Sequence, residues 1–120
     1  MKEIFAVFVL APACRGWAAT TRAADRGEAG RIGLPGGKVD AGESALAALL
    51  RESREEGWEI TGVEPIPHRM AMVEGKLVAW YKAKHAAPLA HYKEKGRIVP
   101  VVASREEILA SGYGNENLKI

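Results

Sequence analysis

Three glutamates lie close together near the middle of the chain. Glu52, Glu55 and Glu56 belong to the charged run RESREE at residues 51–56. If this run is helical, at about 100° per residue, the three carboxylates share one arc of the helix surface. Glu52 and Glu56 then repel each other at i,i+4, and the end of the helix disfavours anions. A divalent cation such as Mg²⁺, which prefers carboxylate oxygens, would relieve this repulsion.

Two glycines before this run bear on its interpretation. The glutamates alone are equally typical of a charged helix face in contact with solvent. Gly36 and Gly37 leave backbone groups unshielded, so that a carbonyl can bind a metal ion and N–H groups can bind phosphate. Lys38 adds a positive charge at the same place. The loop therefore favours a site for a metal ion and a phosphorylated ligand.

The glutamates are predicted to lie on a helix that spans residues 44–56. This segment contains three Leu, three Ala and neither Pro nor Gly, with Ser44 suited to the N-cap and Gly57 to the stop. The carboxylates occupy one arc of this helix. A second arc beside it, about 100° wide, is predicted to pack on a sheet and contains Leu46, Leu49, Leu50 and Ser53.

Short apolar segments on both sides of the helix predict the remaining elements. Strands are expected at residues 3–10, 17–23 and 97–103, with an extended piece at 31–34 and two or three strands within 58–67 and 70–83. Residues 73–76 are typical of a hairpin turn, 84–97 of a loop, and 104–110 of a short helix opened by a capping box. Pro100 indicates a sheet edge or a bulge. Strands interspersed with two helices predict an α+β domain, within the broad α/β class, with a mixed sheet.

Composition and charge limit the class of protein. A chain of 120 residues suits a single domain, here residues 1–120, and 48% apolar with 27% charged residues is typical of a globular protein. The net charge of +2 is small and the basic residues are scattered. A nucleic-acid partner is therefore not expected.

The apolar run at the N-terminus has two interpretations. Residues 4–14 have the outline of a signal peptide, but the run is short and Lys2 is opposed by Glu3. It is also too short to span a bilayer, and its Ile, Val and Phe content favours a buried strand. The single cysteine, Cys14, excludes an intrachain disulfide and suits a reducing compartment. A cytoplasmic protein without a membrane partner is expected.

The segment at residues 36–58, GGKVDAGESALAALLRESREEGW, resembles the Nudix box G-x5-E-x7-R-E-U-x-E-E-x-G-U, where U is a bulky aliphatic residue. Six box positions match at the required spacing: Gly37, Glu43, Arg51, Glu52, Glu55 and Glu56. At an average usage of ~7% per residue, six such matches arise by chance at roughly one in ten million per starting position. The leading LPGGK at residues 34–38 also resembles the family. The resemblance implies a Nudix-like α/β/α sandwich with a central mixed sheet.

Two features depart from the box. Ser53 stands where the family packs an aliphatic side chain, and Gly57-Trp58-Glu59 stands where x-G-U is expected, as if one residue were missing before Gly57. Both departures affect how the helix packs and ends. They leave the carboxylates in place.

The resemblance implies a metal-dependent hydrolase that cuts a phosphoanhydride bond in a nucleoside diphosphate derivative. Its metal ligands would be Glu52, Glu55, Glu56 and the carbonyl of Gly36, with Mg²⁺ as the expected ion and Mn²⁺ as a possible replacement. Glu52 and Glu55 are the candidate catalytic residues, and Glu52 is the first choice to orient or deprotonate the attacking water.

Other positions are assigned supporting roles by the same resemblance. Gly37, Glu43 and Arg51 would hold the loop and the helix in register. An additional acid from a later loop would be Glu94, with Glu74 as its competitor. Substrate-binding candidates are Lys38, Asn115 and Asn117, since an asparagine amide can pair with a purine edge.

The expected partner is a small-molecule nucleotide, and the resemblance also allows a homodimer. A (d)NTP pyrophosphohydrolase is the first interpretation, because the chain is short and shows no further signature around the box. A dinucleoside polyphosphate or nucleotide-sugar hydrolase is the second. The irregular end of the box motivates a third interpretation, a nucleotide-binding module without turnover.

Overall fold

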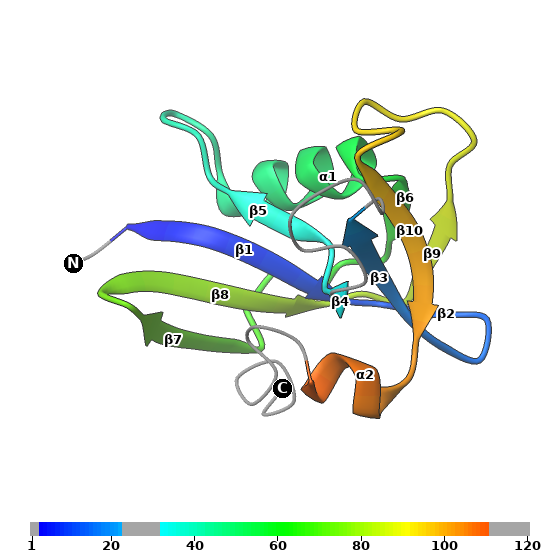
Figure 1. The fold of residues 1–120 in the computed structure, drawn as a ribbon. Helices are drawn as coiled ribbons and strands as arrows, with labels where there is room; N and C mark the ends of the chain where they lie inside the picture. The colour runs from blue at the N-terminus through cyan, green and yellow to red at the C-terminus, as the bar shows by residue number, and fades with distance from the viewer. Residues whose placement is uncertain (1–2, 23–31, 111–120) are drawn as a thin grey trace.

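The computed structural model describes residues 3–22 and 32–110, which form a layered α+β fold (Figure 1). No helix among these residues is long and apolar enough to cross a membrane. In chain order the elements are β1 (Ile4–Leu10), β2 (Pro12–Ala13), β3 (Gly16–Arg22), β4 (Ile32–Gly33), β5 (Gly36–Lys38), α1 (Ala45–Glu55), β6 (Trp58–Thr61), β7 (Arg69–Val73), β8 (Lys76–Lys82), β9 (His85–Pro88), β10 (Ile98–Ala103) and α2 (Arg105–Leu109).

The central sheet is mixed, as the sequence predicts. Its strand order is β5-β1-β8-β7, with β1 parallel to β8 and antiparallel to β5, and with β7 antiparallel to β8. The apolar strand β1 lies in the interior of this sheet, and Val7 and Val9 are fully buried. The predicted hairpin between β7 and β8 is present, and its turn residues Glu74 and Gly75 have φ of 51° and 79°.

Two smaller sheets accompany the central sheet. One has the order β10-β3-β2, with β4 paired to β3, so Pro100 lies on an edge strand as predicted. The other pairs β6 with β9 in antiparallel register. Residues 84–97 were expected to form a loop throughout, and the strand β9 corrects this prediction. Ala86 is buried in β9, and the backbone of this strand pairs with β6. The segment is short and rich in alanine, so its sequence pattern does not indicate a strand.

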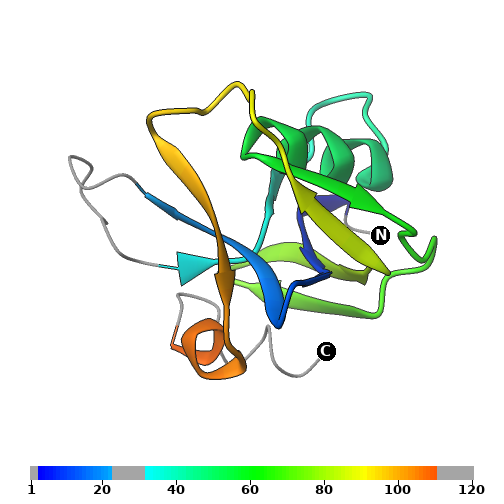
Figure 2. The same ribbon diagram turned by 90° about the vertical axis from the view of Figure 1, so that its right-hand side faces the viewer.

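The two helices lie on opposite sides of the strands (Figures 1 and 2). Helix α1 covers one core cluster, in which Ala48 and Leu49 pack with Val7 and Val9. Helix α2, opened by the predicted capping box at Ser104, covers the other cluster through the fully buried Ile108. This layering is the α/β/α arrangement that the sequence resemblance implies.

Helix α1 begins and ends close to the predicted positions. Its N-cap Ser44 accepts a hydrogen bond from the N–H of Ala47 at 3.1 Å. Gly57 follows the C-cap with φ of 102°, a conformation that favours glycine and stops the helix.

The face of α1 that packs on the strands differs from the prediction. Leu49 and Ser53, expected in the packed arc, are fully buried, but Leu50, expected there too, is 40% exposed, whereas Ala48 from the carboxylate side is fully buried. The small side chains of Ala45 and Ala48 let the alanine side of the helix approach the sheet, which rotates Leu50 outward. Glu52 and Glu56, at i+4 and i+8 from Ala48, therefore lie on the inward side of the helix and not beside the packed arc.

Candidate functional site

Strand β5 lies so close to its neighbours that a β-carbon would clash with them at two positions. A β-carbon on Gly37 would lie 2.7 Å from Cδ of Glu52. Gly36 has φ of 145°, and a β-carbon there would overlap the carbonyl oxygen of Val7. Because both β-carbons are excluded, the carboxylate of Glu52 rests on the backbone of Gly37.

Glu56 points back from the end of α1 toward β5. Its Oε1 accepts a hydrogen bond from the N–H of Gly36 at 2.9 Å. Burial, together with the charges of Glu52, Glu94 and Glu55, raises the pKa of Glu56 to about 8, against the opposing effect of the Gly36 hydrogen bond. Four carboxylates therefore lie near this end of the helix, and the charges of three of them act on the fourth.

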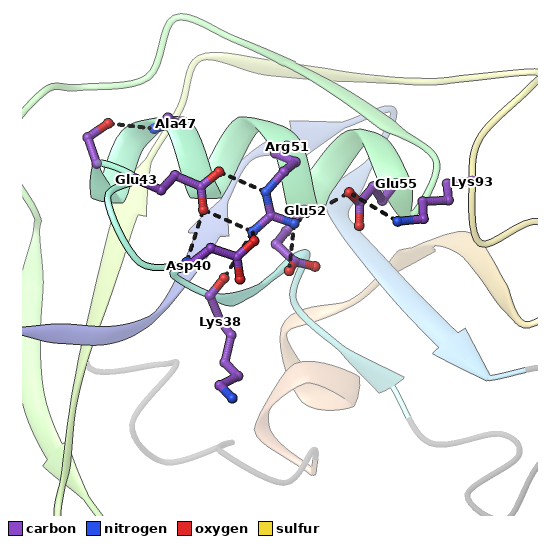
Figure 3. Close-up of polar contacts among 9 residues, drawn as sticks. Lys38, Asp40, Glu43, Ala47, Arg51, Glu52, Glu55 and Lys93 are labelled. Carbon is purple, nitrogen blue, oxygen red and sulfur yellow. Dashed lines mark hydrogen bonds and ion pairs between the residues drawn. The ribbon is translucent and has the colours of Figure 1, made fainter.

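Arg51 joins the helix to the loop at residues 38–43 (Figure 3). Its Nε and Nη2 donate to the two carboxylate oxygens of Glu43 at 2.7 and 3.0 Å, a bidentate pair. Nη2 also donates to the carbonyl of Lys38 at 3.1 Å and lies 3.4 Å from the carboxylate of Asp40. The hydrogen bonds from Arg51 lower the pKa of Glu43. The guanidinium therefore fixes the loop to the second turn of the helix.

The third nitrogen of Arg51 faces the catalytic candidates. Nη1 donates to Oε1 of Glu52 at 3.1 Å and to Oε2 of Glu55 at 3.4 Å. The two carboxylates thus already reach one common point that holds a cation, here a guanidinium group. Burial, which outweighs the contacts with Arg51, raises the pKa of Glu52.

The donor set suits a hard divalent cation. Carboxylate oxygens are the ligands that Mg²⁺ prefers, and the charges of Glu52, Glu94 and Glu55 add to burial in raising the pKa of Glu56. Within residues 3–22 and 32–110, however, no three His, Cys, Asp or Glu side chains are already arranged to hold a metal ion. Glu56 is turned to Gly36 and Arg51 lies between the others, so an incoming ion requires these carboxylates to rotate.

The loop at residues 89–97 lies against the end of helix α1. The N–H of Glu94 donates to the carbonyl of Glu55 at 2.8 Å, and the charge of Glu94 helps raise the pKa of Glu56. Glu74, the competing acid, lies in the β7–β8 turn and is not among the groups that raise this pKa. Of the two later acids, the structure brings only Glu94 to the cluster.

Two residues near the cluster were not predicted from the sequence. The carboxylate of Asp40 lies 3.4 Å from Nη2 of Arg51, and Nζ of Lys93 lies 3.9 Å from Oε2 of Glu55. Asp40 stands inside the box, at a position where the motif specifies no residue type. Lys93 precedes the candidate Glu94, and that adjacency was the available signal.

The side chain of Lys38, the one substrate-binding candidate within the described residues, points away from the carboxylates (Figure 3). Lys38 is exposed on β5, with its Nζ 5.3 Å from the centroid of the Phe5 ring, and Nζ of Lys76 lies 4.4 Å from the same ring. Asn115 and Asn117 lie outside the described residues.

The residues that depart from the box lie on the inner side of α1 and in β6. Ser53 is fully buried, and its hydroxyl has no hydrogen-bond partner among the described residues. Trp58 is 2% exposed, and its Nε1 donates to the carbonyl of Ala19 at 2.7 Å. Glu59 lies on the surface side and pairs with Arg54 at 2.7 Å. None of these contacts involves a carboxylate of the candidate site.

Solved structures share this fold. A MutT structure from work on Aliivibrio salmonicida and Vibrio cholerae is 23% identical, with a TM-score of 0.66 over 91% of this chain and 85% of that chain. The ORF135 protein of E. coli is 28% identical, with a TM-score of 0.62 over 92% of this chain and 80% of that one. An ADP compounds hydrolase is 19% identical, with a TM-score of 0.67 over 94% of this chain and 65% of the other.

Family comparison addresses the sequence directly. A comparison with the curated proteins found no match. The family model described as the NUDIX domain matches residues 4–82, which include every box position and the strands on both sides of α1. Because this match covers more than half of the chain, the protein belongs to the Nudix hydrolase family.

Proposed function

We propose that this Nudix hydrolase is a Mg²⁺-dependent pyrophosphohydrolase that acts on a (d)NTP. The observation that carries the proposal is the meeting of Glu52, Glu55, Glu56 and Glu94 at the end of α1, where burial and mutual repulsion raise the pKa of Glu56 to about 8. A divalent ion and the phosphates that accompany it are the partners that such a cluster lacks.

The metal ligands we propose are Glu52, Glu55, Glu56 and the carbonyl of Gly36, with Glu94 as a further acid. A bound Mg²⁺, or Mn²⁺ in its place, supplies charge neutralisation at phosphorus and a lower pKa for bound water. The glycine backbone at β5 keeps the carboxylates within reach of this point, since side chains there would displace Glu52.

Glu52 is the proposed acceptor for the proton of the attacking water. Its Oε1 accepts from Arg51, so Oε2 is the oxygen left for the water. Burial raises the pKa of this carboxyl, which makes it a better proton acceptor near neutral pH than an ordinary glutamate. Glu55 shares the Arg51 nitrogen and is the second catalytic candidate.

Gly37, Glu43 and Arg51 are proposed as positioning residues. Arg51 makes a bidentate pair with Glu43 and a contact to each catalytic candidate. Through these contacts one guanidinium group fixes the loop, the helix and both carboxylates relative to one another. Lys38, Asn115 and Asn117 remain candidates for contacts with the nucleotide.

The second candidate function is hydrolysis of a dinucleoside polyphosphate or a nucleotide sugar. The fold likeness to a protein described as an ADP compounds hydrolase favours keeping this class in any test. In both cases the partner is a small-molecule nucleotide, since a net charge of +2 is too small to favour nucleic acid.

The test is a screen for phosphate and pyrophosphate release from nucleoside triphosphates, oxidised nucleotides, dinucleoside polyphosphates and nucleotide sugars. It is run with Mg²⁺ and with Mn²⁺. Glu55→Gln and Glu56→Gln are expected to lower turnover by ~100-fold or more, because each removes a ligand charge. Glu106→Gln, on the exposed side of α2, is the matched control and is expected to retain turnover.

Two outcomes would contradict the proposal. Near wild-type turnover in both glutamine variants would exclude the assigned metal site. Absence of product from every substrate, with nucleotide binding still measurable, would instead support a binding module without turnover.

A further inference from the structure

The loop at residues 89–97 is fixed to the end of helix α1 at two points. The N–H of Leu89 donates to the carbonyl of Gly57 at 2.8 Å, and the N–H of Glu94 donates to the carbonyl of Glu55 at 2.8 Å. These bonds hold the loop backbone against the last turn of the helix. Any side chain between them has a defined starting point relative to the carboxylates.

The loop is also closed on itself. The N–H groups of Arg97 and Ile98 both donate to the carbonyl of Glu94 at 2.9 Å, and the hydroxyl of Tyr92 donates to the carbonyl of Ile98 at 3.0 Å. Lys93 lies in the sequence between Tyr92 and Glu94, which both take part in these hydrogen bonds. Its backbone is therefore held on both sides, while its side chain is free to move.

Lys93 approaches the site from the solvent side. Its Nζ lies 3.9 Å from Oε2 of Glu55, the same oxygen that accepts from Arg51 at 3.4 Å (Figure 3). The Lys93 side chain is 72% exposed, whereas that of Glu55 is 21% exposed. The exposed ammonium group thus lies on the solvent side of a candidate metal ligand.

We propose that Lys93 is a phosphate-binding residue that pairs with Glu55 in the metal-free protein and contacts the polyphosphate of the substrate once Glu55 binds the metal ion. The inference rests on the proposed function and adds to it a residue that recognises the substrate. On this proposal the loop contributes to the site both a positive charge, Lys93, and an acid, Glu94.

The chemistry of the pair favours such an exchange. An exposed ion pair at this distance contributes little, so the pair opens readily. A lysine ammonium is a compact charge that binds phosphate oxygens well. A metal ion on Glu55 removes the partner of Lys93, and phosphates brought to that metal ion offer a new one within reach of the same side chain.

The two roles of Lys93 predict effects of opposite sign for Lys93→Met. The first readout is Mn²⁺ binding to the nucleotide-free protein, measured by electron paramagnetic resonance of the free ion. It is expected to tighten about twofold to fivefold, because a competing cation is gone. The second is calorimetric binding of methylenediphosphonate, a non-hydrolysable pyrophosphate analogue, at saturating Mn²⁺. It is expected to weaken about tenfold, because a charge-assisted contact is lost.

Lys95→Met is the matched control on the same loop. Lys95 donates to the carbonyl of Ala90 at 3.0 Å and forms no ion pair with a site carboxylate among the described residues, so both affinities are expected to stay at wild-type values. Lys93→Arg keeps the charge and is expected to restore most of the diphosphonate affinity. A purely structural role for Lys93 would move both affinities in the same direction.

The outcomes separate this inference from the proposed function. Unchanged diphosphonate affinity in Lys93→Met, with Mn²⁺ binding intact in the wild type and lost in Glu56→Gln, would overturn the role of Lys93 alone. Failure of the wild type to bind Mn²⁺ would overturn the metal site and the role of Lys93 with it. Circular dichroism of each variant establishes that the fold is retained, and Lys93→Gln provides a second test of the same charge.

Discussion

At the scale of single residues, the site is held together by one cation that is shared among several carboxylates. The guanidinium group of Arg51 contacts Glu43, Glu52 and Glu55, and Asp40 lies 3.4 Å from it. One positive charge cannot balance four negative ones. The residual negative charge is the property that a metal ion would use, and it also sets how the metal-free protein responds to pH.

Glu56 predicts a pH dependence of stability. Its pKa rises from an ordinary value near 4.5 to about 8 on folding, so the folded protein retains a proton that the unfolded chain releases. Stability is therefore greatest below the unfolded pKa and is lost as pH rises toward the folded pKa. In EDTA, Glu56→Gln is expected to be more stable than the wild type at pH 8 by on the order of 4 kcal/mol, and close to it at pH 5.

Urea unfolding at the two pH values measures this difference. The same change at the exposed Glu106 controls for the loss of one negative charge in general. Equal stability of the wild type and Glu56→Gln at both pH values would contradict the raised pKa. Adding Mg²⁺ at pH 8 is expected to stabilise the wild type and not the variant.

Two serines of α1 predict opposite results for the same substitution. The buried Ser53 hydroxyl lacks a partner, so Ser53→Ala removes a desolvated polar group and is expected to stabilise the protein by about 1 kcal/mol. Ser44 caps the helix, so Ser44→Ala is expected to destabilise it by about 1 kcal/mol. The midpoints of urea unfolding compare the two variants. Destabilisation by Ser53→Ala would indicate a hidden hydrogen bond.

At the scale of elements, the sequence predicted the positions of the box residues on the helix better than the direction in which the helix packs. Spacing alone placed Glu52, Glu55 and Glu56 on one side of α1, because helical geometry is local. The packed arc was predicted correctly at Leu49 and Ser53, but it was extended to the exposed Leu50 and omitted the buried Ala48. Which side meets a sheet depends on how close the backbones can approach, and here the alanines and the glycines of β5 decide it.

The strand β9 shows a second limit of local patterns. His85–Pro88 has four residues, two of them alanine, and no alternation that distinguishes it from a loop. Its partner β6 lies before the β7–β8 hairpin, so the pairing is non-local. For the same reason Glu94 was named as an additional acid only from the resemblance, whereas the contact of Lys93 with Glu55 was not predicted at all.

Two glycines with positive φ allow a matched test of the helix end. Gly42 has φ of 78° and open space around its β-position, whereas Gly57 has φ of 102° and a β-carbon there would lie 2.9 Å from Cγ of Pro100. Gly42→Ala is expected to cost about 1 kcal/mol from backbone strain alone. Gly57→Ala adds the clash and is expected to cost about 2 kcal/mol or more. An equal loss of stability in the two variants, measured by thermal unfolding, would show that Pro100 of β10 moves away from the new β-carbon without cost.

At the scale of the whole molecule, the site is assembled from three parts of the chain. Helix α1 carries the glutamates, β5 presents the glycine backbone, and the loop at residues 89–97 supplies Glu94 and Lys93. The strands between them set their distances. Damage to the sheet is therefore expected to affect the site even where no site residue is changed.

We propose that the chain behaves as one folding unit, and predict a single unfolding transition. Both core clusters contact the central sheet, one through Val7 and Val9 and the other through Ala6 and Trp80. Unfolding of either core cluster is therefore expected to expose the other to solvent. Tryptophan fluorescence, to which the buried Trp58 and Trp80 contribute, and far-ultraviolet circular dichroism are expected to give the same urea midpoint. Two separate midpoints would contradict one unit.

The parallel pairing of β1 with β8 also affects how the protein is made. In that ladder Leu10 is the partner of Lys82, so the first strand leaves the ribosome well before the strand that pairs with it. At 5 to 20 residues per second, roughly 4 to 14 s separate the synthesis of the two. During this time IFAVFVL is an apolar, strand-forming segment without its neighbour, the kind of segment that aggregates. The yield of soluble protein in a cell should therefore depend on translation speed and chaperone supply as much as on the stability of the finished fold.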